Sequence, residues 1–381
     1  MRILHAADLH LGIKYSQLPR NVAQTMRHAS ISVLQNLVQL ANENQAILLL
    51  AGDTFEAQAI TEAELAQATS ILEQCEMPIV AVAGNHDPYY PQSLYERFVD
   101  LPNFHLLGVD SMRLDLPQYD LTIYGQSFKQ IHVFSSLMPE VVEKINADRM
   151  GDEKPLTNNV LLMHGDIYQK QNTSVYNPMA LDTLMELPVA YVALGHIHKP
   201  ENFKLGVFSA TEKCCYAGAP IGHSFKNIGP KRCLLVELEE NRIIKQEAIS
   251  LDIPRFEEQR IVLQSAHTLA QSEEILKFLQ TDENYKRNLY RLYLKGETEF
   301  EPDLSAIKLQ LPCYVELFDR TVRPLAEQDT DSVKGLFAHA IAQKKSRPDL
   351  TSEEQEIIDL AYSLGLEILK GELDILDRWS H

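Results

Sequence analysis

The sequence predicts an α/β fold, because segments typical of strands alternate with segments typical of helices. Five short runs rich in β-branched and aliphatic residues read as strands, at 2–5, 46–50, 79–82, 160–163 and 189–194. Apolar residues recur every three to four positions over 21–44, as on one helix face, and 61–75 has a similar pattern. Strands and helices in this order pack as layers.

A small polar cluster follows each of the five predicted strands. The clusters are Asp8-Leu9-His10, Gly52-Asp53, Gly84-Asn85-His86-Asp87, His164-Gly165-Asp166 and Gly195-His196-Ile197-His198. Functional groups in such sheets gather beyond the carboxyl ends of the strands, so we expect the clusters to meet there. In extended backbone, residues two apart point to the same side, so Asp8 with His10, and His196 with His198, are each expected to present two groups to one site.

The clusters combine carboxylate, amide and imidazole groups, which suit manganese, iron or zinc. One such cluster is weak support, because a lone Gly-Asp after a strand is usually a turn. The histidines are more specific. Of the thirteen in the chain, five lie at strand ends within these clusters, a placement that ordinary core or surface histidines would not produce. The set as a whole therefore predicts a metal site.

The chain is also long enough for further domains, because its 381 residues exceed the usual ~100–200 residues of one domain. The composition changes near Pro254 and again after Pro324. We therefore predict three domains, 1–253, 254–325 and 326–381.

The second predicted domain is a small α/β unit and the third is helical. Runs at 260–263, 289–294 and 314–318 read as strands, with a helix at 268–279. In the third domain 331–345 reads as a helix, and the capping-box pair Thr351 and Glu354 begins another helix that ends near 371.

Composition places the chain in the cytoplasm and gives it an acidic character. The longest apolar runs, such as 46–51, are far shorter than a membrane span, and the start MRILHAADLH leaves no room for a secretory leader. Five cysteines without a C-x-x-C pair suit a reducing compartment. The formal charge is -18, and each predicted domain carries more acidic than basic residues, which is unfavourable for holding a polyanion.

The order of the clusters resembles the signature of the calcineurin-like metallophosphoesterases, which is D-x-H, G-D, G-N-H-D, an isolated H and G-H-x-H. The resemblance implies a four-layer α/β/β/α sandwich and two divalent metal ions, with Mn²⁺ expected and Fe²⁺ or Zn²⁺ as alternatives. It implies that Asp53 bridges the metals. The other implied ligands are Asp8, His10 and His198 for one metal, and Asn85, His164 and His196 for the other. His86 would stabilise the transition state or protonate the leaving oxygen, with Asp87 orienting and charging its imidazole.

Further motifs resemble the SbcD/Mre-type DNA repair exonuclease subunits, in particular a YhaO-like branch. These motifs are ILHAADLHLG at the start, GHIHKP from Gly195, YAGAPIGHSF from Tyr216 and GPKRCLLVEL from Gly229. The resemblance implies a nuclease whose partners are DNA and an SbcC/Rad-type coiled-coil ATPase, with 254–325 as a DNA-binding cap, the C-terminal helices as the ATPase dock, and a homodimer. Candidate phosphate contacts are Lys199, Lys204, Lys226, Lys231, Arg232, Lys286, Arg287, Arg291 and Lys295.

Several alternatives stay open. Val333, Leu336, Phe337 and Ile341 would either dock a partner or pack on their own chain. Some relatives carry a second histidine three residues after the bridging aspartate, where this chain has Glu56. A phosphatase or cyclic-nucleotide phosphodiesterase would explain the acidity better than a nuclease does. A non-catalytic scaffold of the same fold is the remaining alternative.

Overall fold

The chain divides into two compact units, Met1–Glu257 and Glu258–His381. The computed structural model describes residues 1–98, 100–152, 154–169, 174–204, 212–264, 268–296, 298, 301–321, 332–347 and 350–369. The predicted change at Pro254 lies close to the observed division. The predicted boundary between 325 and 326, and the predicted helix end near 371, lie outside the described residues.

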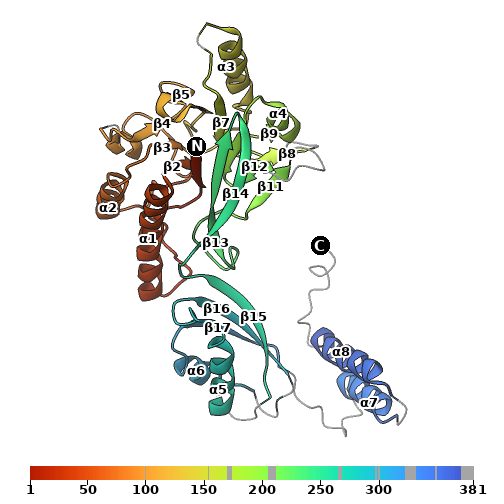
Figure 1. Ribbon diagram of the computed structural model, residues 1–381. Coiled ribbons are helices and arrows are strands. Elements are labelled where there is room, and N and C mark those ends of the chain that lie inside the picture. Colours follow the sequence, from red (N-terminus) through yellow and green to blue (C-terminus); the bar gives the residue numbers. More distant parts are fainter. Residues whose placement is uncertain are drawn as a thin grey trace. The chain divides into compact units, whose positions relative to one another are not determined.

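The first unit contains two six-stranded sheets (Figure 1). The first sheet has the order β14 (Arg242–Leu251), β13 (Lys231–Glu239), β1 (Arg2–Ala6), β2 (Ala46–Ala51), β3 (Ile79–Val82) and β4 (Phe104–Leu106). The second has the order β11 (Glu201–Lys204), β12 (Glu212–Tyr216), β10 (Tyr191–Gly195), β7 (Asn158–His164), β6 (Leu121–Gly125) and β5 (Arg113–Leu116). Strands β2 and β3 contact β7 or β10, so the sheets pack face to face.

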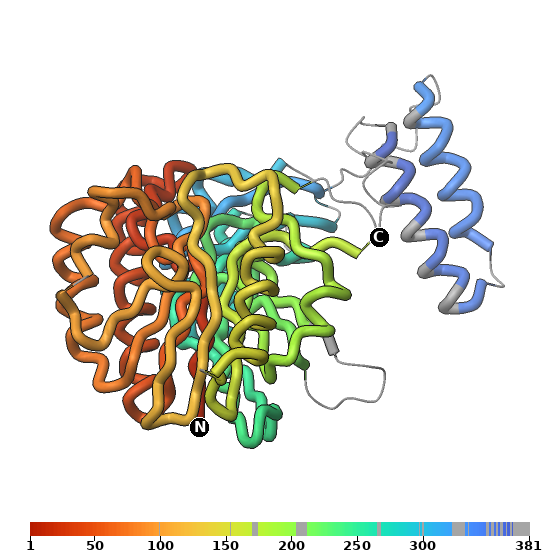
Figure 2. The backbone as a smooth tube through the Cα atoms, turned by 90° about the horizontal axis from the view of Figure 1, so that it is seen from above, coloured from red at the N-terminus to blue at the C-terminus, as the bar shows by residue number. Residues whose placement is uncertain are grey.

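Helices cover the outer face of each sheet. In the first layer α1 (Arg20–Asn44) contacts β1, β2 and α2 (Glu62–Leu72). On the other side α3 (Met138–Met150) contacts β6, and α4 (Leu181–Glu186) contacts β12. Figure 2 shows the red and orange N-terminal segments on one side of this unit and the yellow and green segments on the other. The predicted four-layer α/β/β/α sandwich is confirmed.

Burial explains why these strands stand out in the sequence. Every residue of β2, β7 and β10 is buried, since each strand is covered on both faces, and strands of this kind contain a continuous apolar run. Helix α1 turns Met26, Val33 and Leu37 inward, as its three-to-four-residue period predicts. The short elements of this unit are η1 (Leu94–Phe98), η2 (Pro117–Tyr119), β8 (Ile167–Tyr168) and β9 (Met179–Ala180).

The second unit contains a three-stranded sheet and a helical hairpin. Strands β15 (Phe256–Val262), β16 (Leu289–Lys295) and β17 (Tyr314–Asp319) pair in this order, and α5 (Thr268–Leu279) and α6 (Leu304–Leu309) accompany them. Ile275, Leu292 and Val315 belong to their shared apolar core. Strand β15 begins at Phe256, just before the division between the units.

The hairpin consists of α7 (Val333–Lys345) and α8 (Ser352–Leu369), and the predicted capping box is present at Thr351. Phe337 stacks on Tyr362 with ring centroids 6.2 Å apart, and Ile341 is buried, whereas Val333 and Leu336 are exposed. The four apolar residues of α7 therefore divide between packing on the chain and exposure. No described helix combines the length and apolarity needed to cross a bilayer.

Candidate metal centre

The five polar clusters meet at one edge of the sandwich. They follow the carboxyl ends of β1, β2, β3, β7 and β10, and these strands lie centrally in the two sheets. The nine predicted site residues are Asp8, His10, Asp53, Asn85, His86, Asp87, His164, His196 and His198. Three overlapping groups of side chains there could each hold a metal ion, and two of them contain Asp53.

The carboxylate of Asp53 lies between two sets of imidazoles. Its Oδ2 is 3.6 Å from Nε2 of His10 and 3.4 Å from Nε2 of His164, while its Oδ1 accepts a hydrogen bond from the backbone N–H of His86. Burial alone would raise the pKa of Asp53, but the neighbouring imidazoles outweigh it and lower the pKa below its ordinary value. A carboxylate in this position can serve both sides, as the resemblance implies for a bridging ligand.

The remaining ligand atoms lie in two groups on either side of Asp53. On one side Nε2 of His10 is 3.2 Å from Nε2 of His198. On the other side Oδ1 of Asn85 is 3.1 Å from Nε2 of His164 and 3.1 Å from Nδ1 of His196. Ligand bonds of about 2.0–2.2 Å place neighbouring ligand atoms roughly 3.0–3.5 Å apart around one cation. These atoms therefore have the spacing of ligands that share a metal ion.

Asp8 provides a direct test of whether the centre fits a cation. Its Oδ1 accepts a hydrogen bond of 2.9 Å from the backbone of His196, but its Oδ2 is buried without a hydrogen-bond partner among the described residues. Burial raises the pKa of Asp8 to about 6. A buried carboxylate oxygen without a partner is costly, and a divalent cation would satisfy it. The residues present thus fit a metal centre.

The backbone at the centre is strained in a way that the sequence pattern did not predict. Asp8, His10, Asp53 and His196 have φ values of 56°, 48°, 50° and 109°, in the left-handed region that non-glycine residues seldom adopt. The expectation that Asp8 with His10, and His196 with His198, project from extended segments is therefore wrong. Sharp turns make these side chains converge instead. Gly84 is required beside them, because a Cβ there would overlap Oδ1 of Asp53.

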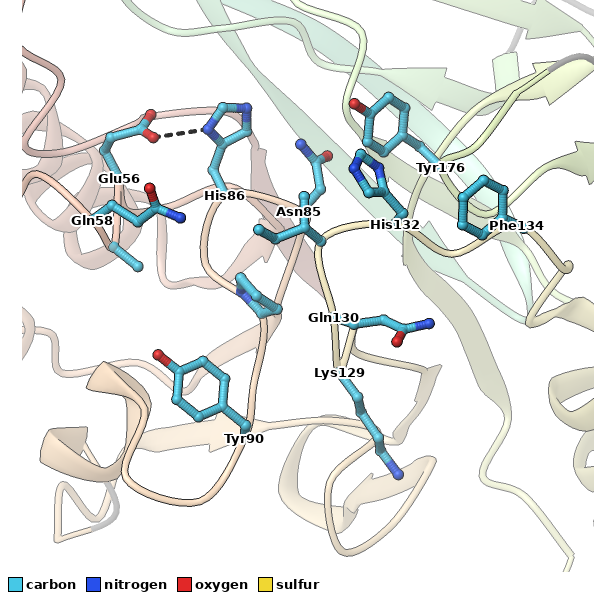
Figure 3. Close-up of a pocket in the computed structure, with 13 residues that line it drawn as sticks. Glu56, Gln58, Asn85, His86, Tyr90, Lys129, Gln130, His132, Phe134 and Tyr176 are labelled. Atoms are coloured by element: carbon cyan, nitrogen blue, oxygen red, sulfur yellow. Dashed lines mark hydrogen bonds and ion pairs between the residues drawn. The ribbon is translucent and has the colours of Figure 1, made fainter.

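The carboxylate that orients His86 is Glu56, so the prediction that Asp87 orients this imidazole is wrong, whereas the predicted effect of the Asp87 charge is present. Nδ1 of His86 lies 2.9 Å from Oε1 of Glu56, as the dashed line in Figure 3 shows. Asp87 is fully buried and accepts hydrogen bonds from Gly84 N, Phe55 N and the Tyr95 hydroxyl, so both of its oxygens are used in holding the loop. Asp87 acts on His86 only through its charge, which contributes to raising the histidine pKa.

Glu56 also contacts a predicted metal ligand. Its Oε2 is 3.2 Å from Nδ1 of His10, so the carboxylate spans His10 and His86. Burial would raise the pKa of Glu56, but the two imidazoles lower it to about 2. The hydrogen bond between Glu56 and His86 is in turn the largest cause of the raised pKa of His86. Glu56 therefore holds two imidazoles with their Nε2 atoms directed away from it.

His223 is a residue of the centre that the sequence analysis did not select. Its ring centroid lies 4.7 Å from that of His10 and 4.9 Å from that of His198, and the three histidines form one of the groups that could hold a metal ion. Its Nε2 is buried without a hydrogen-bond partner among the described residues, and burial keeps its pKa well below the ordinary value. The available signal was its position within the YAGAPIGHSF motif, which begins at Tyr216, the last residue of β12, a strand that the sequence analysis did not predict.

A hydrogen bond and an ion pair orient two of the predicted ligands. Nδ1 of His164 bonds to the carbonyl of Ala51 at 2.9 Å, and Nε2 of His196 lies 3.4 Å from Asp166, so both rings are held.

Two of the predicted phosphate contacts are not available for that role. Lys231 is buried and Arg291 is paired with Glu316, which argues against both as free phosphate contacts. The side chain of Lys204 lies outside the described part of the chain.

Comparisons with known proteins agree with this geometry. The metallophosphoesterase YhaO of Bacillus subtilis is 24% identical in an alignment that spans 99% of both chains. The SbcD component of the SbcCD nuclease of the same organism is 25% identical over 60% of this chain and 64% of SbcD. The sequence model of the calcineurin-like phosphoesterases matches residues 1–200, which include every predicted metal ligand. The chain therefore belongs to the calcineurin-like phosphoesterase family.

Proposed function

We propose that this chain is a metal-dependent nuclease that hydrolyses phosphodiester bonds of DNA. The observation that carries the proposal is the position of Asp53 between two groups of ligand atoms, since such a centre suits hydrolysis of a phosphate ester. The choice of DNA rests on the similarity to a protein named as part of a nuclease. The second unit adds a folded region that a small-substrate phosphatase would not need.

Two divalent ions, with Mn²⁺ proposed, would share Asp53. One would be held by Asp8, His10 and His198, and the other by Asn85, His164 and His196. Bound cations would supply an activated water as nucleophile and would offset the negative charge of the phosphate.

His86 supplies the proton in this proposal. Its side chain is 43% exposed, so it can reach a bound substrate, and Glu56 accepts the hydrogen bond of Nδ1–H. That contact leaves Nε2–H free to donate to the leaving oxygen of the sugar. An alkoxide is a poor leaving group, so proton donation at this atom speeds bond cleavage.

The test is digestion of labelled duplex and single-stranded DNA with Mn²⁺ or EDTA, beside an assay with a phosphomonoester. We expect cleavage of DNA with Mn²⁺ and none with EDTA. The His86→Ala variant should retain bound metal and lose turnover. Monoester turnover by the wild-type chain without cleavage of DNA would overturn the nuclease proposal.

The acidic balance favours one alternative, a phosphatase or cyclic-nucleotide phosphodiesterase that uses the same centre. A chain with a formal charge of -18 binds a long polyanion poorly by itself. If the substrate is DNA, a homodimer or an ATPase partner supplies additional contacts to it. The alternative predicts that adding a partner leaves the rate on DNA unchanged.

The proposed partner is an SbcC/Rad-type ATPase that docks on α7 and α8. Val333, Leu336 and Ile357 are exposed on this hairpin, and such residues form the apolar part of an interface. Deleting 331–381 should leave hydrolysis of a small phosphodiester unchanged and remove binding of the ATPase. Loss of folding in the truncated chain would instead favour packing of the helices on their own chain. The five free cysteines support a cytoplasmic location for such a complex.

A further inference from the structure

A large cavity opens beside the metal centre, on the side of Asn85 and His86. Its volume is about 740 Å³, within the roughly 300–1,000 Å³ range of small-molecule sites. Figure 3 shows Glu56 and His86 at one end of the cavity and His132, Phe134 and Tyr176 gathered at the other. Any group bound in the cavity would therefore lie next to a phosphate held at the centre.

The far end of the cavity is a cluster of three aromatic rings. The ring of His132 lies 5.9 Å from that of Phe134 and 5.6 Å from that of Tyr176. Tyr176 in turn lies 4.9 Å from His196, so the cluster is continuous with the predicted ligands. Phe134 is 65% exposed, and Ile131 and Tyr90 in the same cavity are also exposed, so together they give it the apolar lining that is typical of a binding site.

Polar groups of the cavity complement the rings. Lys129 is exposed and has no ion-pair partner among the residues that the structure describes. Gln58 and Gln130 provide amide donors and acceptors along the wall, and Ile131 is its exposed aliphatic residue. Flat π-faces, amides and one cation are the groups that bind a nucleobase with its phosphate, whereas an alkyl chain would need an aliphatic wall.

We propose that this cavity is a nucleobase subsite, in which an unpaired base beside the scissile phosphate stacks on Phe134 within the His132–Tyr176 cluster, with Lys129 near the adjoining phosphate. This inference rests on the proposed nuclease function and adds the substrate class. A base inside a duplex has both faces covered, so it must leave the helix before it can stack here. The subsite therefore favours single-stranded or frayed ends and tolerates any base, because every base has a π-face.

The first experiment is a cycle of two changes, one in the protein and one in the DNA. The protein change is Phe134→Leu, which keeps apolar volume and removes the ring, with Phe134→Trp as the variant that keeps a ring. The DNA change replaces one nucleoside beside the cleaved bond by an abasic tetrahydrofuran, on the 3′ or on the 5′ side in separate substrates. Met150→Ala, an exposed apolar residue of α3 that does not line the cavity, is the control.

Stacking of one base corresponds to about 5- to 150-fold in kcat/KM. The wild-type chain should lose this factor on one of the two abasic substrates. Phe134→Leu should lose a similar factor on normal DNA and nothing further on that abasic substrate. Phe134→Trp, which keeps a ring, should still lose activity on that abasic substrate, and the control Met150→Ala should behave as the wild type does. If the losses in kcat/KM from Phe134→Leu and from the abasic substitution multiply when the two changes are combined, the ring and the base act independently and the proposal is overturned.

The second experiment measures binding without turnover. The chain contains one tryptophan, Trp379, so Phe134→Trp combined with Trp379→Phe places a single fluorophore in the cavity. With EDTA present, a normal single-stranded oligonucleotide should quench this fluorescence, and the same oligonucleotide with the abasic site should not. Equal quenching by both oligonucleotides would overturn the subsite. Quenching by phosphotyrosine but by neither oligonucleotide would also overturn it, because the cavity would then bind an aromatic phosphomonoester and not a base.

The two experiments separate the inference from the function on which it rests. If the wild-type chain does not cleave DNA, the nuclease proposal fails, while quenching still reports on base binding. If the chain cleaves DNA and Phe134→Leu cleaves normal DNA at the wild-type rate, the subsite fails and the nuclease proposal stands.

Discussion

Replacing Glu56 with glutamine tests the role of the carboxylate that spans His10 and His86. Glutamine keeps the shape of the side chain and one accepting oxygen but removes the negative charge. Oε1 and Oε2 of Glu56 lie 2.9 Å from His86 and 3.2 Å from His10, so the change affects both imidazoles directly. The variant separates the effect of Glu56 on His10, a proposed metal ligand, from its effect on His86, the proposed acid.

The expected magnitude follows from the two hydrogen bonds. A charge-assisted hydrogen bond contributes ~1.5–3 kcal/mol, but His86 is 43% exposed and solvent screens its partner, so we expect ~1–2 kcal/mol at this pair. This energy corresponds to about a 5- to 30-fold loss of kcat wherever protonation of the leaving group limits the rate. Loss of the contact to His10 should also weaken metal binding, by about 10- to 100-fold.

The assay compares two diesters at saturating Mn²⁺. Cleavage of DNA expels a sugar alkoxide, which needs a proton, whereas bis(4-nitrophenyl) phosphate expels a stable phenolate. Glu56→Gln should therefore lose about 5- to 30-fold on DNA and less than about 2-fold on the nitrophenyl ester. Equal losses on both substrates at saturating metal would refute the assignment. Glu73→Gln, an exposed glutamate at the end of α2, is the control.

Three further predictions concern the centre and the core. His223→Ala should lower the bound Mn²⁺ measured by elemental analysis after dialysis, whereas the exposed His28→Ala should not; equal metal content would exclude His223 from the centre. Gly84→Ala should displace Asp53 and reduce metal binding by at least about 10-fold in calorimetry, and unchanged binding would contradict the clash. Burial lowers the pKa of His5 to about 3 from 6.5, so the unfolded chain binds this proton more readily. His5 therefore contributes up to about 3–5 kcal/mol above pH 6.5, and that stability is lost as pH falls toward 3. Chemical denaturation of the metal-free chain should show a shallower pH dependence in His5→Gln over this range, and parallel curves would contradict the reasoning.

Much of the fold follows from local patterns in the sequence. Strands β2, β7 and β10 are covered on both faces, so each contains a continuous apolar run, and a polar cluster marks the carboxyl end of each run. The turn of α1 is likewise visible in the spacing of its buried residues. For this reason the five strands that precede the polar clusters, and helices α1 and α2, were predictable within a few residues.

The hydrogen-bond partners of the proposed catalytic side chain, His86, were less predictable. Asp87 adjoins His86 in the chain, and that adjacency suggested a pair, but neighbouring residues point in different directions at a sharp turn. Glu56 reaches the imidazole because β2 and β3 are adjacent parallel strands whose ends lie side by side. Adjacency in sequence is therefore a poor guide to hydrogen bonding at a strand end.

The sequence by itself determined the alternation of strands and helices in the first unit and the polar clusters at the strand ends, because burial imposes a periodicity that short segments reveal. Only the tertiary structure decided that Glu56 holds His86 and that His223 joins His10. It also decided that His132 and Tyr176, from two separate loops, form one aromatic wall. Hydrogen bonding and stacking depend on distances in space, and these are set only when distant segments pack together.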